Sequence, residues 1–295
     1  MELLKVENLC KTYPSFKLQD VSFSLEEGYI MGFIGRNGAG KTTTIKSMLN
    51  IVSAEKGSSK ICGYDIQTNE DEVKKSIGFI SGTDGFYSTK KLKTISSVYK
   101  KFFATWNQEK YESLLQKFKL DENKKIKELS AGMKIKFQLA LAMSHDAKLL
   151  ILDEPTSGLD PVSRDELILL FQEYVADEKH SILFSTHVIS DLEKCADFIT
   201  YINNGKILKS TDSVSFKQDY RLISGKNDEL SDELKSKIIG LNINKFGFEG
   251  MIRVENAELF SSCGLRGQIR AELSCRVEST SARFRHRSNL AESHP

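Results

Sequence analysis

No stretch of this 295-residue sequence approaches the roughly 18 consecutive apolar residues that a membrane-spanning helix needs. The N-terminus has neither the apolar run nor the small-residue cleavage site of a signal peptide. The 5 cysteines are odd in number and widely scattered, which suggests neither a disulfide framework nor a zinc site. Together these absences predict a soluble protein in a reducing cytosol.

A basic stripe is missing as well. The net charge is +2, and residues 261–295, with six arginines and three glutamates, carry +3, which leaves −1 on residues 1–260. Proteins that bind nucleic acid usually gather lysine and arginine on one face. The balanced body therefore predicts that nucleic acid is not a partner.

The last 35 residues differ in composition from the rest of the chain. Every lysine lies at or before Lys245, whereas seven of the ten arginines lie at or after Arg253. This final segment, 261–295, has no sustained helical or strand period, so we predict a disordered or non-native tail, with a natural basic tail as the alternative. Before it we expect a main domain at 1–215 and a small accessory unit at 216–260 that contains a polar helix and short strands.

The main domain alternates short apolar strands with helical segments. Strands buried on both faces are expected at 29–34, 149–152 and 181–184, and helices at 41–49 and 165–175. This alternation predicts an α/β fold with a parallel sheet covered by helices.

Other segments of the main domain have different patterns. Residues 3–9 and 18–25 alternate apolar and polar side chains, which predicts an antiparallel sheet beside the parallel one. Asn204-Gly205 predicts a hairpin, because both residue types tolerate positive φ. Residues 86–144 have mostly helical periodicity.

Four aromatic residues in this helical part, Tyr99, Phe102, Phe103 and Trp106, are spaced i, i+3, i+4 and i+7. Such a stripe on one helix face is typical of a side that packs into a core. We therefore predict that all four belong to the hydrophobic core.

A glycine-rich loop is the strongest chemical signal. Residues 35–42 fit the pattern G-x-x-x-x-G-K-[ST], with a buried strand before the loop and a helix after it. Glycines let backbone N–H groups approach phosphates, and the helix N-terminus adds the positive end of its dipole. Lys41 would reach the β- and γ-phosphates, and the Thr42 hydroxyl would ligate Mg²⁺. The predicted nucleotide contacts of this loop are Gly35, Arg36, Asn37, Gly38, Ala39, Gly40, Lys41, Thr42 and Thr43.

Two acidic residues, Asp153 and Glu154, end the apolar strand at 149–152. Asp153 would bind Mg²⁺ together with Thr42. Glu154 extends one residue further and would act as the general base that polarises an attacking water, an effect typically worth about 10²–10⁴ in rate.

Further motifs carry a family resemblance. Leu129-Ser130-Ala131-Gly132-Met133 resembles the signature motif of ATP-binding-cassette (ABC) proteins. Residues 157–160 look like the D-loop of that family, and residues 185–187 like its switch-histidine motif. Tyr13 stands where the family places an aromatic ring on adenine. The order and spacing match over about residues 1–215, and the chain is most similar to ATPase subunits of bacterial exporters for antimicrobial peptides, phenol-soluble modulins and drugs.

The resemblance implies a P-loop NTPase core with a parallel sheet, an antiparallel β subdomain and a helical signature subdomain at about 86–144. It implies ATP and Mg²⁺ as ligands, with Ser130, Gly132 and Asp160 on the ATP held by a second nucleotide-binding subunit, in a homo- or heterodimer. His187 would contact the γ-phosphate as a second catalytic residue. The implied partner is a membrane-embedded permease, which would hold the chain at the cytoplasmic face of the cell membrane.

The sequence departs from the family pattern at three positions. Ala131 stands where glycine is usual in the signature, and Met133 stands where glutamine is usual. Gly82 stands where the family usually has a glutamine that touches Mg²⁺ and the lytic water, and loss of such a group can cost on the order of 10²–10³ in rate. An alternative is therefore a slow ATP-binding module that gates a partner. A third class, non-transport ATPases, is disfavoured because only one cassette is present.

Overall fold

The computed structural model of this chain describes residues 1–82, 88–245, 247–261 and 269–270. The chain divides into two compact units, Met1–Ser210 and Thr211–Pro295. The boundary predicted near residue 215 falls inside α8 (Ser213–Asp219), close to this division. Most of the predicted tail, 262–268 and 271–295, lies outside the described residues.

The first unit contains the strands β1 (Glu2–Tyr13), β2 (Phe16–Glu26), β3 (Ile30–Ile34), β4 (Lys56–Ile61), β5 (Tyr64–Asp65), β6 (Ile77–Ser81), β7 (Leu149–Asp153), β8 (Ser181–Thr186), β9 (Phe198–Asn203) and β10 (Lys206–Asp212), the last of which crosses into the second unit. Its helices are α1 (Lys41–Met48), α2 (Glu70–Ser76), α3 (Leu92–Phe102), α4 (Gln108–Lys117), the short 3-10 helix η1 (Ile126–Glu128), α5 (Ala131–Ser144), α6 (Pro161–Tyr174) and α7 (Ile189–Cys195).

The central sheet has the strand order β10-β9-β3-β8-β7-β6, and its pairs β9-β3, β3-β8, β8-β7 and β7-β6 are parallel. All residues of β3, β7 and β8 are buried, as expected for strands covered on both faces. The α/β fold with a parallel sheet is thereby confirmed. Parallel register matters for the site, because it brings the C-terminal ends of β3, β7 and β8 to one edge.

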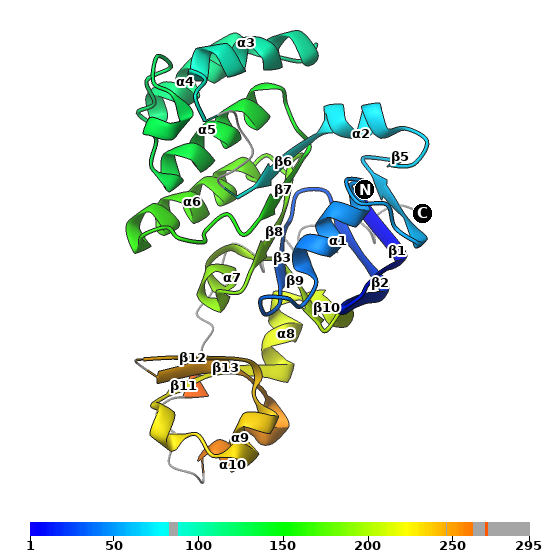
Figure 1. Ribbon diagram of the computed structural model, residues 1–295, viewed down its shortest axis with the longest axis vertical. Helices are drawn as coiled ribbons and strands as arrows, with labels where there is room; N and C mark the ends of the chain where they lie inside the picture. The colour runs from blue at the N-terminus through cyan, green and yellow to red at the C-terminus, as the bar shows by residue number, and fades with distance from the viewer. Residues whose placement is uncertain (83–87, 246, 262–268, 271–295) are drawn as a thin grey trace, which may run out of the picture. The chain divides into compact units, whose positions relative to one another are not determined.

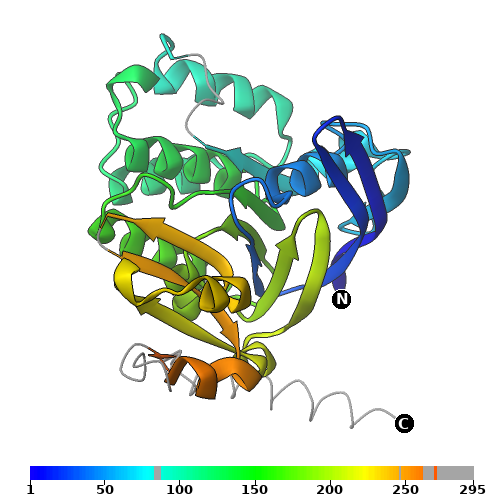
Figure 2. The same ribbon diagram turned by 60° about the horizontal axis from the view of Figure 1, so that its bottom comes forward.

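A second, antiparallel sheet has the order β2-β1-β4-β5, which confirms the expected antiparallel subdomain. Helix α1 packs between the two sheets. Its residues Ile45 and Met48 share one buried cluster with Leu9 of β1 and Leu183 of β8. In both views the blue strands β1 and β2 lie beside α1 (Figure 1 and Figure 2). This packing orients the N-terminus of α1.

The predicted hairpin at 198–208 is confirmed. Asn204 and Gly205 have φ values of 46° and 73° between β9 and β10. A Cβ on Gly205 would collide with the backbone carbonyl of Lys17, so the turn both requires positive φ and packs tightly on the neighbouring chain.

The prediction that all four aromatic residues belong to the core is wrong, because Phe102 is exposed and Tyr99, Phe103 and Trp106 are only half-buried. Helix α3 ends at Phe102, which is 75% exposed, so the stripe does not continue on one helix face. Phe103 adopts extended backbone and stacks on His145 with ring centroids 3.8 Å apart. Trp106 lies in the following loop and packs at 5.1 Å on Tyr111. Tyr99 and Phe103 are half-buried and stack on each other at 5.6 Å.

The second unit is built on an antiparallel sheet of order β12-β13-β11-β14. Its elements are α8, β11 (Tyr220–Gly225), the 3-10 helix η2 (Asn227–Glu229), α9 (Asp232–Lys237), β12 (Ile239–Asn244), β13 (Gly247–Arg253), the 3-10 helix η3 (Val254–Asn256), α10 (Ala257–Phe260) and β14 (Ile269–Arg270). Ile223, Leu234, Ile252 and Phe260 form its own buried core, which gives this unit an independent hydrophobic centre.

Candidate functional site

The glycine-rich loop joins β3 to α1 at the C-terminal edge of the central sheet. Gly38 and Gly40 adopt φ values of 79° and 113°, which L side chains rarely reach. A Cβ on Gly38 would meet no heavy atom within 4 Å and would stand in open space beside the loop, whereas one on Gly40 would approach Phe16 to 2.7 Å. Helix α1 has no side-chain cap and no acid in its first turn. Its first N–H groups therefore face this loop with the positive end of the helix dipole.

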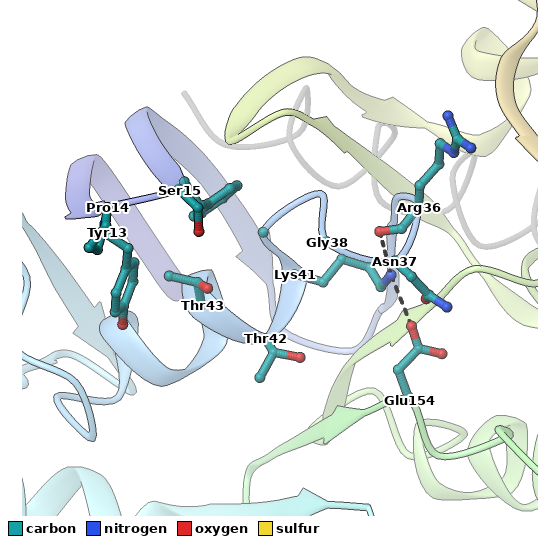
Figure 3. A pocket seen from close by; sticks show the side chains of 12 residues that line it. Tyr13, Pro14, Ser15, Arg36, Asn37, Gly38, Lys41, Thr42, Thr43 and Glu154 are labelled. Atoms are coloured by element: carbon teal, nitrogen blue, oxygen red, sulfur yellow. Dashed lines mark hydrogen bonds and ion pairs between the residues drawn. The ribbon is translucent and has the colours of Figure 1, made fainter.

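A cleft of ≈ 760 Å³ opens over the loop. Its lining consists of Tyr13, Pro14, Ser15, Phe16, Arg36, Asn37, Gly38, Gly40, Lys41, Thr42, Thr43 and Glu154 (Figure 3). Nine of these were predicted from the sequence, whereas Pro14, Ser15 and Phe16, in the turn and at the start of β2, were missed. Of the other predicted loop residues, Gly35 and Ala39 are buried behind the lining.

Lys41 is the only buried lysine among the described residues, with 5% of its surface exposed. Its Nζ donates to the carbonyl oxygens of Gly35 at 2.6 Å and Arg36 at 3.2 Å, and it pairs with Glu154 Oε1 at 2.9 Å (Figure 3). A buried ammonium needs such acceptors because desolvation is costly. The contacts place a fixed positive charge at the floor of the cleft.

Glu154 links two other predicted residues. Its Oε1 faces Lys41, and its Oε2 lies 2.8 Å from His187 Nδ1. The residue has a φ of 54°, which is unusual for glutamate, and its N–H donates to Ser185 Oγ at 2.9 Å. The structure therefore brings Lys41, Glu154 and His187 into one chain of contacts across the ends of β3, β7 and β8.

Ser185 opens the motif at residues 185–187, but the sequence alone indicates no role for it. Its hydroxyl donates to Asp153 Oδ1 at 2.7 Å while accepting from the Glu154 N–H. This double contact is possible because β7 and β8 are parallel with Asp153 opposite Ser185. Ser185 thus orients both acids, and Asp153 is held buried at the end of β7.

Ser130, Gly132 and Asp160 gather at two neighbouring helix starts. Ser130 caps α5 by accepting from the Met133 N–H at 3.2 Å. Asp160 caps α6, with one oxygen accepting from the Ser163 N–H at 3.0 Å and the other from the Ser163 hydroxyl at 2.7 Å. These bonds hold the pKa of Asp160 below its usual value. A Cβ on Gly132 would lie 3.7 Å from Ser163, so the two helix starts are adjacent.

None of these three residues belongs to the cleft lining within the described chain. The sequence-predicted site is therefore divided in one copy between the cleft and the pair of helix starts.

Asp191, at the beginning of α7, is a buried carboxylate that lies 3.8 Å from Arg164 of α6. Burial raises the pKa of Asp191.

Gly82 follows β6 with a φ of 51°, and a Cβ there would meet no heavy atom within 4 Å. Its carbonyl oxygen accepts from Gln138 Nε2 of α5 at 3.2 Å. Gln138 had no signal in the sequence, because its contact depends on α5 packing beside β6. Residues 83–87, which follow, lie outside the described residues.

Comparisons with known proteins agree with this arrangement. A model of the family described as ABC transporter matches residues 18–157. The chain is 31% identical over 275 residues to the bacitracin transport ATP-binding protein BcrA of Bacillus licheniformis, covering 90% of this chain and 88% of that protein. It is 29% identical to the phosphonates import ATP-binding protein PhnC of Treponema denticola, covering 82% and 96%.

A solved structure of an ATP-binding subunit of an ABC transporter is 28% identical, with a TM-score of 0.66. That likeness covers 73% of this chain and 92% of the other. The fold is therefore similar to that of an ATP-binding subunit of an ABC transporter.

Proposed function

This chain belongs to the ABC transporter family, as an ATP-binding subunit and an ATPase, and we propose that it drives export through a separate membrane permease by closing with a second nucleotide-binding subunit around ATP. The observation that carries the proposal is the division of the site within one copy. Among the described residues, the lining of the cleft at Lys41 includes neither Ser130 nor Asp160. A second copy would supply the missing half.

For hydrolysis, Glu154 is the proposed general base. Its carboxylate would accept a proton from the water whose oxygen attacks the γ-phosphorus, while the bond from that phosphorus to the oxygen of ADP breaks. His187, 2.8 Å from Glu154, would hold the geometry of attack and contact the γ-phosphate. When ATP binds, the Lys41 ammonium would leave the Glu154 carboxylate and contact the β- and γ-phosphates instead.

Tyr13, at the end of β1 and on the cleft rim, would stack on the adenine. The loop from Gly35 to Thr43 would wrap the phosphates with its backbone N–H groups. These roles use the residues that already line or support the cleft.

Mg²⁺ is the proposed metal. The Thr42 hydroxyl in the cleft lining and the Asp153 carboxylate are hard oxygen donors, and Mg²⁺ prefers one or two such protein ligands together with phosphate oxygens and water. When bound, the ion would neutralise charge that develops on the phosphates. Ser185 would keep the Asp153 carboxylate oriented toward it.

The second subunit would contribute Ser130, Gly132 and Asp160. The free hydroxyl hydrogen of Ser130 and the first N–H groups of α5 form an anion site suited to a γ-phosphate. Asp160 holds the start of α6 beside it. ATP would then join two protomers, as a homo- or heterodimer, and its hydrolysis would release them.

The proposed permease partner and export direction are supported by the similarity to the bacitracin transport ATP-binding protein. The match to the bacitracin transport protein covers 90% of this chain, so it must include part of the second unit as well as the cassette. Within the described residues no helix is long and apolar enough to span a bilayer. The permease would hold the chain at the cytoplasmic face of the membrane.

The proposal is tested by the mass of the protein in solution. The Glu154→Gln variant with ATP and Mg²⁺ should run at twice the 33.3 kDa of one chain in light scattering, and at 33.3 kDa without ATP. Adding Ser130→Arg should abolish the dimer, because the bulky side chain blocks the start of α5. Ser97→Arg on α3 is the matched control and should dimerise. A monomer at saturating ATP, with the permease supplied, would overturn the proposal.

A second candidate, a slow ATP-binding module, is favoured by Gly82. We expect Gly82→Gln to change the steady-state ATPase rate less than about tenfold, because the base and the histidine are already in contact. Gly82→Ala controls for the strain of a side chain at this positive φ. A gain of about a hundredfold in Gly82→Gln alone would favour the slow module.

A further inference from the structure

Helix α3 carries an exposed stripe that the proposed function does not use. Thr94, Val98, Lys101 and Phe102 of α3 are all exposed and are spaced i, i+4, i+7 and i+8, and Lys91, the N-cap residue before the helix, is exposed as well. Residues at these spacings lie along one side of a helix. In both views α3 lies along the top edge of the first unit (Figure 1 and Figure 2).

The apolar part of this stripe is unusual for a helix whose other face is already packed. Leu92, Ile95 and Ser96 are buried and anchor α3 to the unit. Phe102 is nevertheless 75% exposed and Val98, one turn before it, is 46% exposed. Two large apolar side chains of α3 therefore remain substantially exposed.

The charge around them has one sign. Residues 88–108 contain no Asp or Glu and five lysines, Lys90, Lys91, Lys93, Lys100 and Lys101. The ion pairs of the described residues involve none of these five. The backbone of the lysine-rich segment 124–127 runs beside the start of α3, with a bridge between Lys91 and Lys125. Asp121, Glu122 and Glu128 flank that segment, and Glu128 is already bonded to the Lys125 N–H.

We propose that this side of α3, defined by Lys91, Thr94, Val98, Lys101 and Phe102, docks on an anionic lipid surface. Lys91 and Lys101 belong to this side, and each lysine close to an acidic membrane surface adds to the attraction to its headgroups. Exposed Phe and Val side chains can insert at the headgroup boundary while lysines reach the phosphates on long stems. The exposed apolar side chains and lysines follow one another along the helix, an arrangement that suits a planar, negatively charged surface.

The test uses the full-length protein and flotation with lipid vesicles, without nucleotide or permease. Vesicles with about 30% phosphatidylglycerol in phosphatidylcholine should bind the protein at least tenfold better than phosphatidylcholine alone. Binding should be lost when salt rises from about 0.05 M to about 0.5 M, because exposed charges are then screened. Equal binding to both kinds of vesicle, or none to either, would contradict the proposal.

Variants separate α3 from other basic parts of the chain. Phe102→Ser, and the double variant Lys91→Glu/Lys101→Glu, should each lower binding to the acidic vesicles at least tenfold. Lys74→Glu/Lys75→Glu is the matched control, since it makes the same charge change on α2, where both lysines pair with glutamates. It should bind like the wild type.

Two outcomes would refute the assignment. If the α3 variants still bind, another surface is responsible, such as the arginines after residue 261, which every variant retains. If they bind vesicles normally but lose the permease, the stripe recognises a protein. Neither outcome touches ATP-driven dimerisation, so this proposal and the proposed function can fail separately.

Discussion

Replacing Glu154 with glutamine should slow ATP hydrolysis at least about a hundredfold while leaving ATP binding nearly intact. The amide keeps the size of the side chain and its backbone, whose φ of 54° is supported by Ser185. The glutamine amide cannot accept a proton from water as the carboxylate does. The effect should therefore fall on kcat, because the lost step belongs to the transition state.

The measurement is steady-state phosphate release together with nucleotide affinity by calorimetry. Glu166→Gln is a suitable control, because Glu166 is an exposed residue of α6 that pairs with Lys136 outside the cleft. It should retain wild-type turnover. A Glu154→Gln enzyme that hydrolyses ATP at an unchanged rate would show that another group takes the proton.

Replacing Lys41 with alanine is expected to weaken ATP binding by about 30-fold or more, since truncating one partner of a buried charge contact typically costs about 2–5 kcal/mol. Lys41 is buried at the floor of the cleft, and its ammonium pairs with Glu154 Oε1 at 2.9 Å. Removing Lys41 deprives the phosphates of a positive charge, and Glu154 then keeps only its contact with His187 of these two partners.

The same calorimetry measures this loss, and Lys46→Ala provides the control. Lys46 lies on the same helix, α1, but does not line the cleft, so its variant should bind ATP normally. Unchanged affinity in Lys41→Ala would mean that the loop N–H groups hold the phosphates without the lysine. Because Lys41 and Glu154 touch, the effects of their two substitutions should not be additive.

The proposed site is divided between the cleft and two helix starts, and Lys41 and Glu154 both lie on the cleft side. Their loss acts within one copy. Ser130 and Asp160 are on α5 and α6, so substitutions there should act on closure instead. ATP affinity and turnover should therefore report on Lys41 and Glu154, whereas the mass of the dimer should report on Ser130 and Asp160.

The sequence by itself was sufficient wherever the chemistry lies in consecutive residues. The loop at 35–42 needs glycines at positive φ before a helix, and that requirement is visible in the letters. The buried strands at 149–152 and 181–184 show as short, mostly apolar runs. The Asn204-Gly205 turn is likewise recognisable from consecutive residues. The α/β fold and the family could therefore be predicted from the sequence alone.

Only the tertiary structure decided which distant residues meet. Ser185 binds both acids because parallel pairing sets it opposite Asp153, and no local pattern records that register. The contact from Gln138 to Gly82 likewise depends on how α5 packs. Phe102 illustrates the reverse case, since its spacing predicts core but α3 ends there and leaves it exposed. Periodicity reports a helix face, whereas the partner that covers that face is set by long-range packing.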